Sequence, residues 1–493
     1  MRKISNKNLF FLVLGLIILC EIISFTGFFI PVVVNIFTAL VIVVTLFVAL
    51  RKPAYGFLIL LAELIIGSQG YLLWIGHTGN HISLRIALWI VVMVIWLVKE
   101  VTAVIKTKKL AVHFSSFSFY FPFLLLLVAL VAAGVNGFIA HNDSNFIFIE
   151  AKRWLYIITL IPLVIILKEE DLRQDFSMVV SAAVVWVALK TLILLYIFSH
   201  GLALTEVIYA WTRADLLGEI TTLSNGFSRV FLQSQVFAIP AFIFSLAILF
   251  KTLVTRKWQI SKSVVVYGLA SALFLAVIII SLSRSFWFGL GIGLFIILLI
   301  LLRWLRPSIN QVFKGALYLI AIGLTTIIIL FVTLEFPFPK PLFSFNASLL
   351  SDRASTNDAA ADSRWALLPI MNQAIFEQPV FGFGLGKTLT YKTSDPRVVK
   401  SSTNGKYTTN AFEWGWLDLW LKLGIFGIIA YLWLLLAIAK QAILKIKTNP
   451  GQSLACIGAI LALVALNVFT PYLNHPLGFA YLAIIMIVLA YKD

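Results

Sequence analysis

The feature that most constrains this chain is a series of fourteen apolar runs, each about 20 residues long, separated by polar segments. A helix of about 20 residues crosses the roughly 30 Å hydrocarbon core of a bilayer and satisfies its own backbone hydrogen bonds there. We therefore predict an all-α, polytopic transmembrane bundle of about 14 spans, with a range of 12–14. The predicted spans lie near residues 9–27, 31–50, 54–75, 83–104, 118–140, 146–167, 177–198, 232–252, 262–282, 286–303, 314–334, 423–445, 452–470 and 475–491.

The composition excludes a water-soluble enzyme. Hydrophobic residues make up 61% of the 493 residues and charged residues only 12%, against about 25% charged residues in an ordinary soluble domain. A soluble fold of this size could not hide so much apolar surface. The two cysteines lie in apolar runs and predict neither a metal site nor a structural disulfide.

The net charge of +17 has a topological explanation, because Lys and Arg collect in cytoplasmic loops. If the N-terminus lies inside, 22 of the 38 basic residues fall in cytoplasmic segments. The short outer loops hold only Arg85, Arg213, Arg229 and Arg284. We therefore predict a multi-pass protein of the cytoplasmic (inner) membrane with both termini in the cytoplasm. Membrane lipids are its expected surroundings, and nucleic acid is not an expected partner.

One outer segment is far longer than the others and divides the chain into three parts. We predict a transmembrane bundle with spans 1 to 11 at 1–334, an extracytoplasmic loop with interfacial helices at 335–415, and a re-entering helix with spans 12 to 14 at 416–493. Loops of this length are usually functional or disordered. This one predicts a helix over 364–377, with apolar residues on one face. A glycine turn follows at 382–386, and its lack of a strand–helix context argues against a nucleotide site.

Arginines at the outer ends of spans are candidates for a functional site. Arg284 lies in a very short turn within SLSRSFWFG, and Arg153 enters the outer end of the sixth span. Arg85 and Arg229 also lie at outer span ends. Ionisable groups at membrane depth often mark functional sites. The alternative is that these side chains extend to lipid headgroups and have no other role.

Three stretches of the chain carry a family resemblance. They are SLSRSFWFGLGIG at 281–293, SRWALLPIMNQAIFEQPVFGFGLG at 363–386 and EWGWLDLWLKLGIFG at 413–427. In this order, with the long loop between late spans, they resemble the O-antigen ligase-like family of polytopic membrane glycan transferases. That family includes O-antigen ligases and related polysaccharide polymerases. The shared order and outer location make the resemblance specific for the superfamily but uninformative about the substrate.

The resemblance implies a transfer reaction without metal or cofactor. A glycan would pass from a polyprenyl-pyrophosphate carrier to a hydroxyl of a glycan, lipid or protein on the outer membrane face, in cell-surface polysaccharide assembly. Arg284 and Arg364 match the family's two arginines and are the implied catalytic pyrophosphate ligands. Arginine suits this role because it stays charged and offers forked donors to phosphate oxygens. The substrate-binding candidates are Arg153, Arg229, Arg85 and Trp365, whose indole could stack on a sugar.

This sequence departs from the family at one position. Family ligases carry a histidine before the re-entering helix, taken as the group that activates the acceptor, but residues 336–415 contain none. That position falls at about Glu413, which could serve as the catalytic general base if burial raised its pKa. Glu413 could equally begin a helix favourably, and Asp418 and Asp362 are alternative bases. The missing histidine favours a polymerase or divergent transferase over a lipid A–core ligase.

The alternative function is a membrane transporter or flippase of lipid-linked glycans. Such proteins usually show repeated halves and charged groups near the bilayer midplane. Glu21, Glu63 and Lys190 lie within predicted spans and fit that interpretation. No convincing internal repeat accompanies them, and most candidate charges cluster at the outer face, which favours a transferase.

Overall fold

The computed structural model describes residues 5–77, 80–107, 119–169, 171–223, 227–341, 359–393 and 405–491. Within these residues, ten helical segments are long and apolar enough to cross a membrane, which confirms the predicted polytopic bundle. They comprise α1 (Asn6–Phe29), α2 (Pro31–Arg51), α4 (Leu84–Thr107), α5 (Tyr120–Ile139), α8 (Arg173–Ser199), η3 (Gln233–Phe237) with α10 (Ala238–Thr255), α11 (Lys262–Ile280), α12 (Arg284–Ile300) with η4 (Leu301–Leu305), α13 (Ile309–Glu335) and α17 (Gly415–Leu444).

The four other predicted spans correspond to short or interrupted helices. Near 146–167 the chain is divided into α6 (Ser144–Trp154), the 3-10 turn η2 (Leu155–Thr159) and α7 (Leu160–Glu169). The prediction of a span at 54–75 is wrong beyond Ile66, because Gly67 caps the helix and Ser68 and Gly70 turn the chain with positive φ. The three short apolar helices are α3 (Pro53–Ile66), α18 (Pro450–Leu466) and α19 (Pro476–Ala490).

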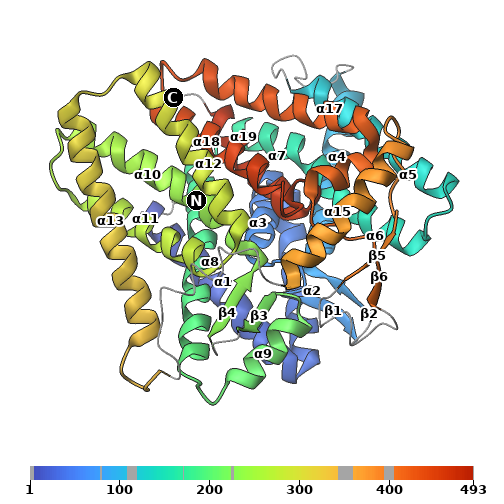
Figure 1. The fold of residues 1–493 in the computed structure, drawn as a ribbon, viewed down its shortest axis with the longest axis horizontal. Helices are drawn as coiled ribbons and strands as arrows, with labels where there is room; N and C mark the ends of the chain where they lie inside the picture. Colours follow the sequence, from blue (N-terminus) through green and yellow to red (C-terminus); the bar gives the residue numbers. More distant parts are fainter. Residues whose placement is uncertain are drawn as a thin grey trace.

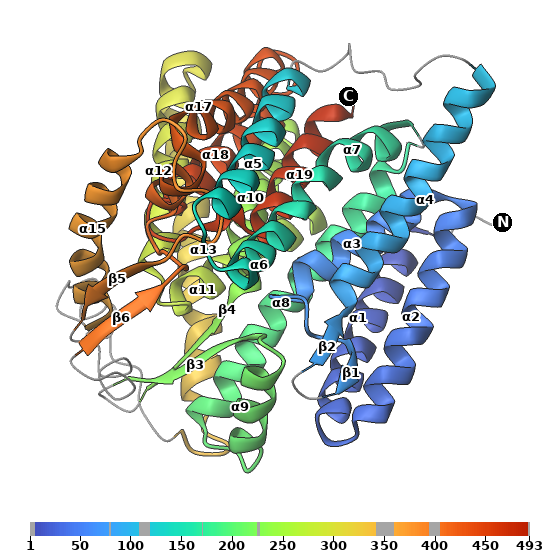
Figure 2. The same ribbon diagram turned by 90° about the vertical axis from the view of Figure 1, so that its right-hand side faces the viewer.

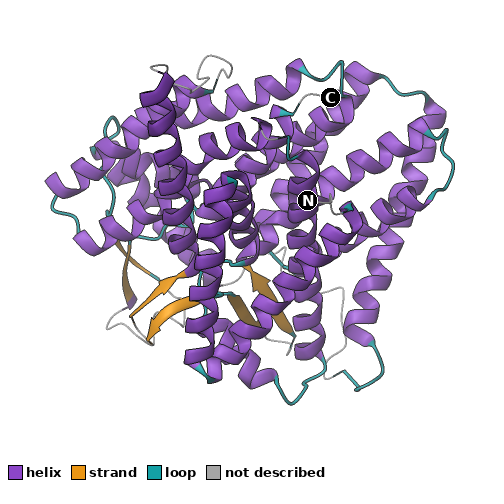
Figure 3. Cartoon of the chain, turned by 180° about the vertical axis from the view of Figure 1, so that it is seen from behind, coloured by secondary structure: helices purple, strands orange, loops and turns teal. Residues whose placement is uncertain are grey.

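Three antiparallel hairpins, which the sequence does not predict, gather at one end of the bundle (Figures 2 and 3). The helix α9 (Thr205–Ala214) lies at the same end, whereas the chain ends at the opposite one (Figure 2). We call the first the hairpin end. Its strand pairs are β1 (Trp74–His77) with β2 (Asn80–Ser83), β3 (Gly218–Thr222) with β4 (Ser228–Leu232), and β5 (Leu389–Lys392) with β6 (Lys406–Thr409).

The long loop thus contains a hairpin as well as a helix. The predicted helix is present as α15 (Ala359–Glu377), which begins five residues before the expected start at Arg364 and includes Pro369. The residues from Gly415 onward form the first turns of α17 and are continuous with a membrane helix.

The centre of the bundle is α19, which packs against α3, α7 and α18 (Figure 1). Its side chains are buried along nearly its whole length, as expected for a helix that is apolar on every side. The peripheral helices α2 and α13 instead expose large apolar side chains, such as Ile36 (66% exposed) and Phe331 (65% exposed). Such a surface suits contact with lipid. The short helices therefore lie inside the protein, and long helices such as α2 and α13 form its apolar exterior.

Candidate active site

Helix α17 bends at Gly424, where φ is 67°. The bend frees the carbonyls of Leu421 and Lys422, which accept hydrogen bonds from the N–H groups of Phe383 (2.7 Å) and Gly384 (3.1 Å). A Cβ atom at Gly424 would overlap a neighbouring backbone segment, so both conformation and space require glycine. The bend sets the first turns of α17 apart from the rest, as expected for a re-entering helix.

The glycine segment, Gly382–Gly386, runs between α5 and α17. The Asn136 side chain of α5 donates to the Gly382 carbonyl at 2.6 Å. All three glycines have positive φ, and Gly384 lies against the Gly137 backbone, where a side chain does not fit. The predicted glycine turn is confirmed, and its glycines let two helices and a loop approach closely.

Three buried charged side chains, Glu150, Asp418 and Lys422, form what we call the charge triad. Lys422 Nζ lies 2.8 Å from Glu150 Oε1 and 2.6 Å from Asp418 Oδ1, and each side chain is at most 7% exposed. Asp418 and Lys422 are one turn apart in α17, whereas Glu150 comes from α6. Buried charges persist when they are paired and hydrogen-bonded. The triad therefore joins α6 to the first turns of α17.

Amide groups complete the coordination of the triad. Asn410 Nδ2 donates to Glu150 Oε1 at 3.1 Å, and the last N–H of the glycine segment donates to Oε2 at 2.9 Å. Asn474 Nδ2 donates to Asp418 Oδ2 at 2.5 Å. The Lys422 ammonium thus lies between two carboxylates. In the described part of the chain, no group of three or more His, Cys, Asp and Glu residues could hold a metal ion.

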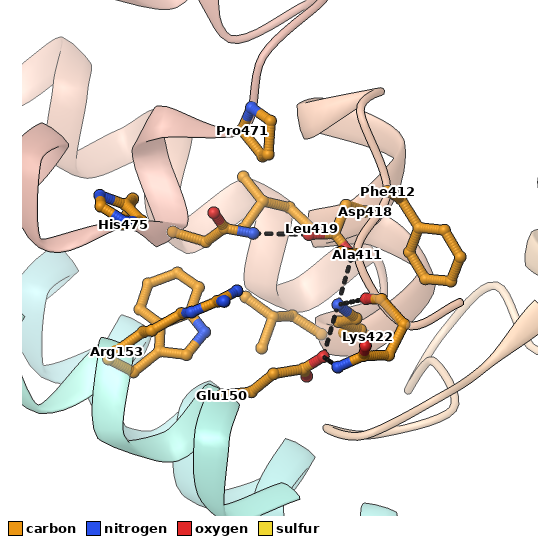
Figure 4. A pocket seen from close by; sticks show the side chains of 13 residues that line it. Glu150, Arg153, Ala411, Phe412, Asp418, Leu419, Lys422, Pro471 and His475 are labelled. Carbon is orange, nitrogen blue, oxygen red and sulfur yellow. Dashed lines mark hydrogen bonds and ion pairs between the residues drawn. The ribbon is translucent and has the colours of Figure 1, made fainter. Parts of the chain in front are cut away.

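A pocket of about 70 Å³, the polar pocket, opens beside the triad (Figure 4). Its walls come from α6, residues 410–412, the first turns of α17 and residues 471–475, including His475. Arg153 of α6 is exposed and extends its guanidinium group between His475 and Glu150 (Figure 4). Among the described residues it makes no hydrogen bond or ion pair. The triad carries two carboxylates and one ammonium, so Arg153 supplies the balancing charge and can still accept an anionic ligand.

An apolar groove of about 800 Å³ begins beside the polar pocket, between α5 and α17. Val128 and Ala132 of α5 and Phe426 and Trp433 of α17 line it. Leu423 lines both the polar pocket and the groove, so the two hollows are neighbours at the bend of α17. The combination suits a molecule with an anionic head and a long apolar tail.

Two of the predicted arginines meet at the turn before α12. Arg284 begins that helix, and Arg229 Nε donates to the Ser281 carbonyl at 2.8 Å. Thr470 Oγ1 donates to Ser285 Oγ at 2.9 Å, and Thr470 directly precedes the pocket wall, which includes η6 (Tyr472–Asn474). The structure therefore brings Arg229 and Arg284 to the pocket's side of the bundle, next to its η6 wall.

Arg364, Glu413 and Trp365 form a separate group on α15 and the start of α17. Arg364 Nε is ion-paired with Glu413, whose side chain is 52% exposed. The Trp365 ring packs at 5.4 Å from that of Trp414, whose Nε1 donates to the Arg364 carbonyl at 3.0 Å. Glu413 directly follows Phe412 of the pocket wall but does not line the pocket. Arg364 therefore already has a carboxylate partner beside the pocket.

Arg85 and Asp362 lie outside this arrangement. Arg85 is buried; its Nε donates to Glu63 at 2.7 Å and its Nη1 to the Ser68 carbonyl at 2.8 Å. Asp362 is exposed in the first turn of α15. Neither side chain lines the polar pocket.

No sequence pattern marks the three residues of the triad as a unit. The spacing of Asp418 and Lys422, i and i+4 in a predicted helix, was a usable signal because it places them on one face. Glu150 lies far earlier in the chain, and no local pattern relates it to Lys422. In the sequence, His475 is an isolated histidine with no neighbouring motif.

These features define a polytopic helical membrane protein with a charged pocket at one side of an apolar groove. Residues 269–432 match the family model described as O-antigen ligase. The resemblance to the O-antigen ligase-like family is thereby confirmed over about a third of the chain, and proteins of this kind are ligase- or polymerase-type glycan-processing enzymes. The matched segment includes Arg284, Arg364, Glu413 and two triad residues, but not Glu150 or Arg153. No curated protein sequence matches the chain.

Proposed function

We propose that the protein transfers a glycan from a polyprenyl-pyrophosphate carrier to a hydroxyl acceptor, with its hairpin end on the outer face of the cytoplasmic membrane. The observation that carries this proposal is that the polar pocket and the apolar groove lie next to each other and share Leu423 as a lining residue. A polyprenyl pyrophosphate has the same division, an anionic head on a long hydrocarbon chain. Burial of that chain in a groove open to the bilayer requires no extraction into water.

In the proposed reaction, the acceptor oxygen forms a bond to the anomeric carbon while the bond from that carbon to the pyrophosphate oxygen breaks. The electron pair leaves with the lipid pyrophosphate. Arg153, Arg284 and Arg364 are the proposed donors to its oxygens, because arginine stays charged and offers forked donors to phosphate oxygens. Arg229 and Trp365 are proposed to border the glycan. Arg85 is proposed only to hold the neighbouring fold, since Glu63 already neutralises it.

The proton of the acceptor hydroxyl must pass to a base, for which the site offers two carboxylates. Glu413 is exposed and paired with Arg364. Asp418 lines the pocket but is held by Lys422 and Asn474. If Glu413 is the base, Glu413→Gln should retain donor binding and lose transfer, whereas Asp418→Asn should retain transfer once protein abundance is matched. The reverse pattern would assign the base to Asp418.

The charges that fit a transporter are neutralised within the bundle. Lys190 Nζ lies 2.8 Å from Glu21 Oε2, and Arg85 pairs with Glu63. Because these four charges are paired, they leave no unpaired midplane charge on these residues to carry an ion. Reconstitution in liposomes distinguishes the flippase alternative from a transferase.

The test is reconstitution in liposomes with a polyprenyl-pyrophosphate glycan, with release of the carrier and formation of a new glycoconjugate both measured. Arg153→Ala and Arg284→Ala should each lower the rate by about a hundredfold, since one lost charged donor costs roughly 3 kcal/mol. Arg284→Lys should fail nearly as badly, because an ammonium lacks the planar fork. Lys152→Ala, which changes the exposed neighbour of Arg153, is the matched control and should be normal.

Wild-type transfer by Arg153→Ala and Arg284→Ala at normal abundance would refute the proposed pyrophosphate site. Movement of the glycan across the bilayer without a new glycosidic bond would favour a flippase.

The groove allows a separate test of the donor. Ala132→Trp should fill it and impair transfer from a long-chain donor, while transfer from a donor with a short prenyl chain persists. Val131→Trp, on the lipid-exposed side of the same helix and outside the groove, is the control. Equal transfer from both donors by Ala132→Trp would contradict the placement of the lipid chain.

A further inference from the structure

A second large cavity, of about 680 Å³, lies between α8 on one side and α10 and α11 on the other. Its inner wall is formed by Ile484 and Val488 of the central helix α19. This volume is in the range of small-molecule sites in proteins. None of its lining residues belongs to the polar pocket or the apolar groove.

The charged groups of this cavity lie at one end, where four helices begin or end. Arg173 is the first residue of α8, Lys251 lies in the last turns of α10, Asn449 caps the start of α18, and Tyr491 caps the end of α19. This end is opposite the hairpin end, because α19 finishes here and the end of the chain, which follows it directly, lies opposite the hairpins. Such a position corresponds to the boundary between hydrocarbon and headgroups.

The rest of the lining is mostly apolar and runs deep into the bundle. On α10 and the turn before it, the lining extends from Lys251 back to Phe237, or about 21 Å at 1.5 Å per helical residue. Half of a bilayer's hydrocarbon is about 15 Å thick. The cavity is therefore long enough for an extended acyl chain that starts at the polar end, with Phe176 and Phe274 among its apolar contacts.

The charge at the polar end is positive on balance. Arg173 and Lys251 are both exposed, and Lys445 is held beside them because its Nζ donates to the carbonyls of Leu489 (2.7 Å) and Tyr491 (2.9 Å). Two carboxylates, Asp171 and Asp175, also lie near Tyr491, and Asp175 accepts a hydrogen bond from Tyr55 at 2.9 Å. Three cations against two carboxylates leave a net attraction for an anion.

We propose that this cavity binds one anionic phospholipid, with its phosphate between Arg173 and Lys251 and its acyl chain along α8, α10 and α11 (Figure 1). An uncharged ligand would not use the cations, and a small anion would leave the apolar length empty. Basic pockets between membrane helices recognise lipid headgroups in this way. The site does not depend on the proposed transfer reaction and would hold the α10–α11 pair against the centre of the bundle.

The experiment is native mass spectrometry of the purified, delipidated protein titrated with phosphatidylglycerol or phosphatidylcholine of the same chains. We expect one phosphatidylglycerol to bind more tightly than phosphatidylcholine. Lys251→Ala should weaken phosphatidylglycerol binding about fivefold, as one basic residue near a membrane surface contributes, and leave phosphatidylcholine binding unchanged. Arg256→Ala is the matched control, because Arg256 is exposed at the end of the same helix but does not line the cavity.

A cavity-filling variant, Ala241→Trp, should remove binding of both lipids. Three results would each overturn the proposal: equal affinity for the two lipids, an equal loss in Lys251→Ala and Arg256→Ala, or full phosphatidylglycerol binding by a folded Ala241→Trp. If Ala241→Trp does not fold, the comparison of Lys251→Ala with Arg256→Ala decides alone.

Discussion

Replacement of Lys422 by methionine tests whether the charge triad holds the site together. The substitution keeps most of the apolar side chain and removes the ammonium group that lies between Glu150 and Asp418. The two carboxylates would then be buried without their cation, each keeping only donors from neutral amides. Removal of one partner from a buried ion pair typically costs about 3–5 kcal/mol.

That cost corresponds to a hundredfold or greater shift of the unfolding equilibrium, since about 1.4 kcal/mol is a factor of ten. It can be measured by SDS titration of the protein in mixed micelles, followed by tryptophan fluorescence. Lys440→Met is the matched control, because Lys440 is an exposed lysine of the same helix. Its effect should stay within about 0.5 kcal/mol, as for other surface substitutions.

The electrostatic origin of the loss can be separated from lost packing. Adding Asp418→Asn to Lys422→Met removes one of the two stranded carboxylates, so the double variant should be more stable than Lys422→Met alone. A double-mutant cycle isolates this coupling, which should reach about 0.5–3 kcal/mol. If Lys422→Met is as stable as Lys440→Met, or if Asp418→Asn lowers stability equally in both backgrounds, the triad does not act as an ionic unit.

Three further predictions follow from particular residues. Gly384→Ala should destabilise the protein by at least about 2 kcal/mol in the same titration, because φ is +80° and a Cβ meets the Gly137 backbone; Gly291→Ala, with open space around it, should be neutral or slightly stabilising. Burial raises the pKa of Asp215 to about 6, so its protonation stabilises the fold, fully below about pH 4 and not above about pH 6. A pH series of melting temperatures should show this component in the wild type and not in Asp215→Asn, and identical pH profiles would contradict it. Transfer by the purified protein should persist in EDTA, because Lys422 and the arginines supply the positive charge, and a magnesium-reversible loss would show that a metal is needed.

The arrangement of the site separates two tasks. The triad is buried and neutralised internally apart from one charge, which suits it to positioning the walls of the polar pocket. Arg153 is exposed at the same pocket, which suits it to contact with a ligand. A buried charge that loses its partner raises the free energy of the protein strongly. The cation proposed to exchange partners, Arg153, therefore lies at the pocket mouth, and the triad with its fixed partners lies behind it.

Much of the fold could be predicted from the sequence because helix formation in lipid is a local requirement. A run of about 20 apolar residues must form its own backbone hydrogen bonds, and the position of such runs is visible without knowledge of any contact. The helix α15 and the glycine turn after it could also be predicted, because apolar periodicity and glycine spacing are local features of the sequence. The prediction of a full span at 54–75 is wrong beyond Ile66. A helix in the interior of the bundle can be shorter than the bilayer is thick, because other helices cover it.

From sequence alone it was possible to predict the class of membrane protein, the family resemblance and a set of arginines near the ends of the predicted spans. The partners of these arginines depend on the folded chain: Arg85 is neutralised by Glu63, Arg364 pairs with Glu413, and Arg153 reaches the polar pocket. Tertiary structure also brought Glu150 to Lys422, and the hairpins to one end of the bundle. The physical reason is that a charged side chain's role depends on the charges and the solvent around it, and these come from segments distant in the chain.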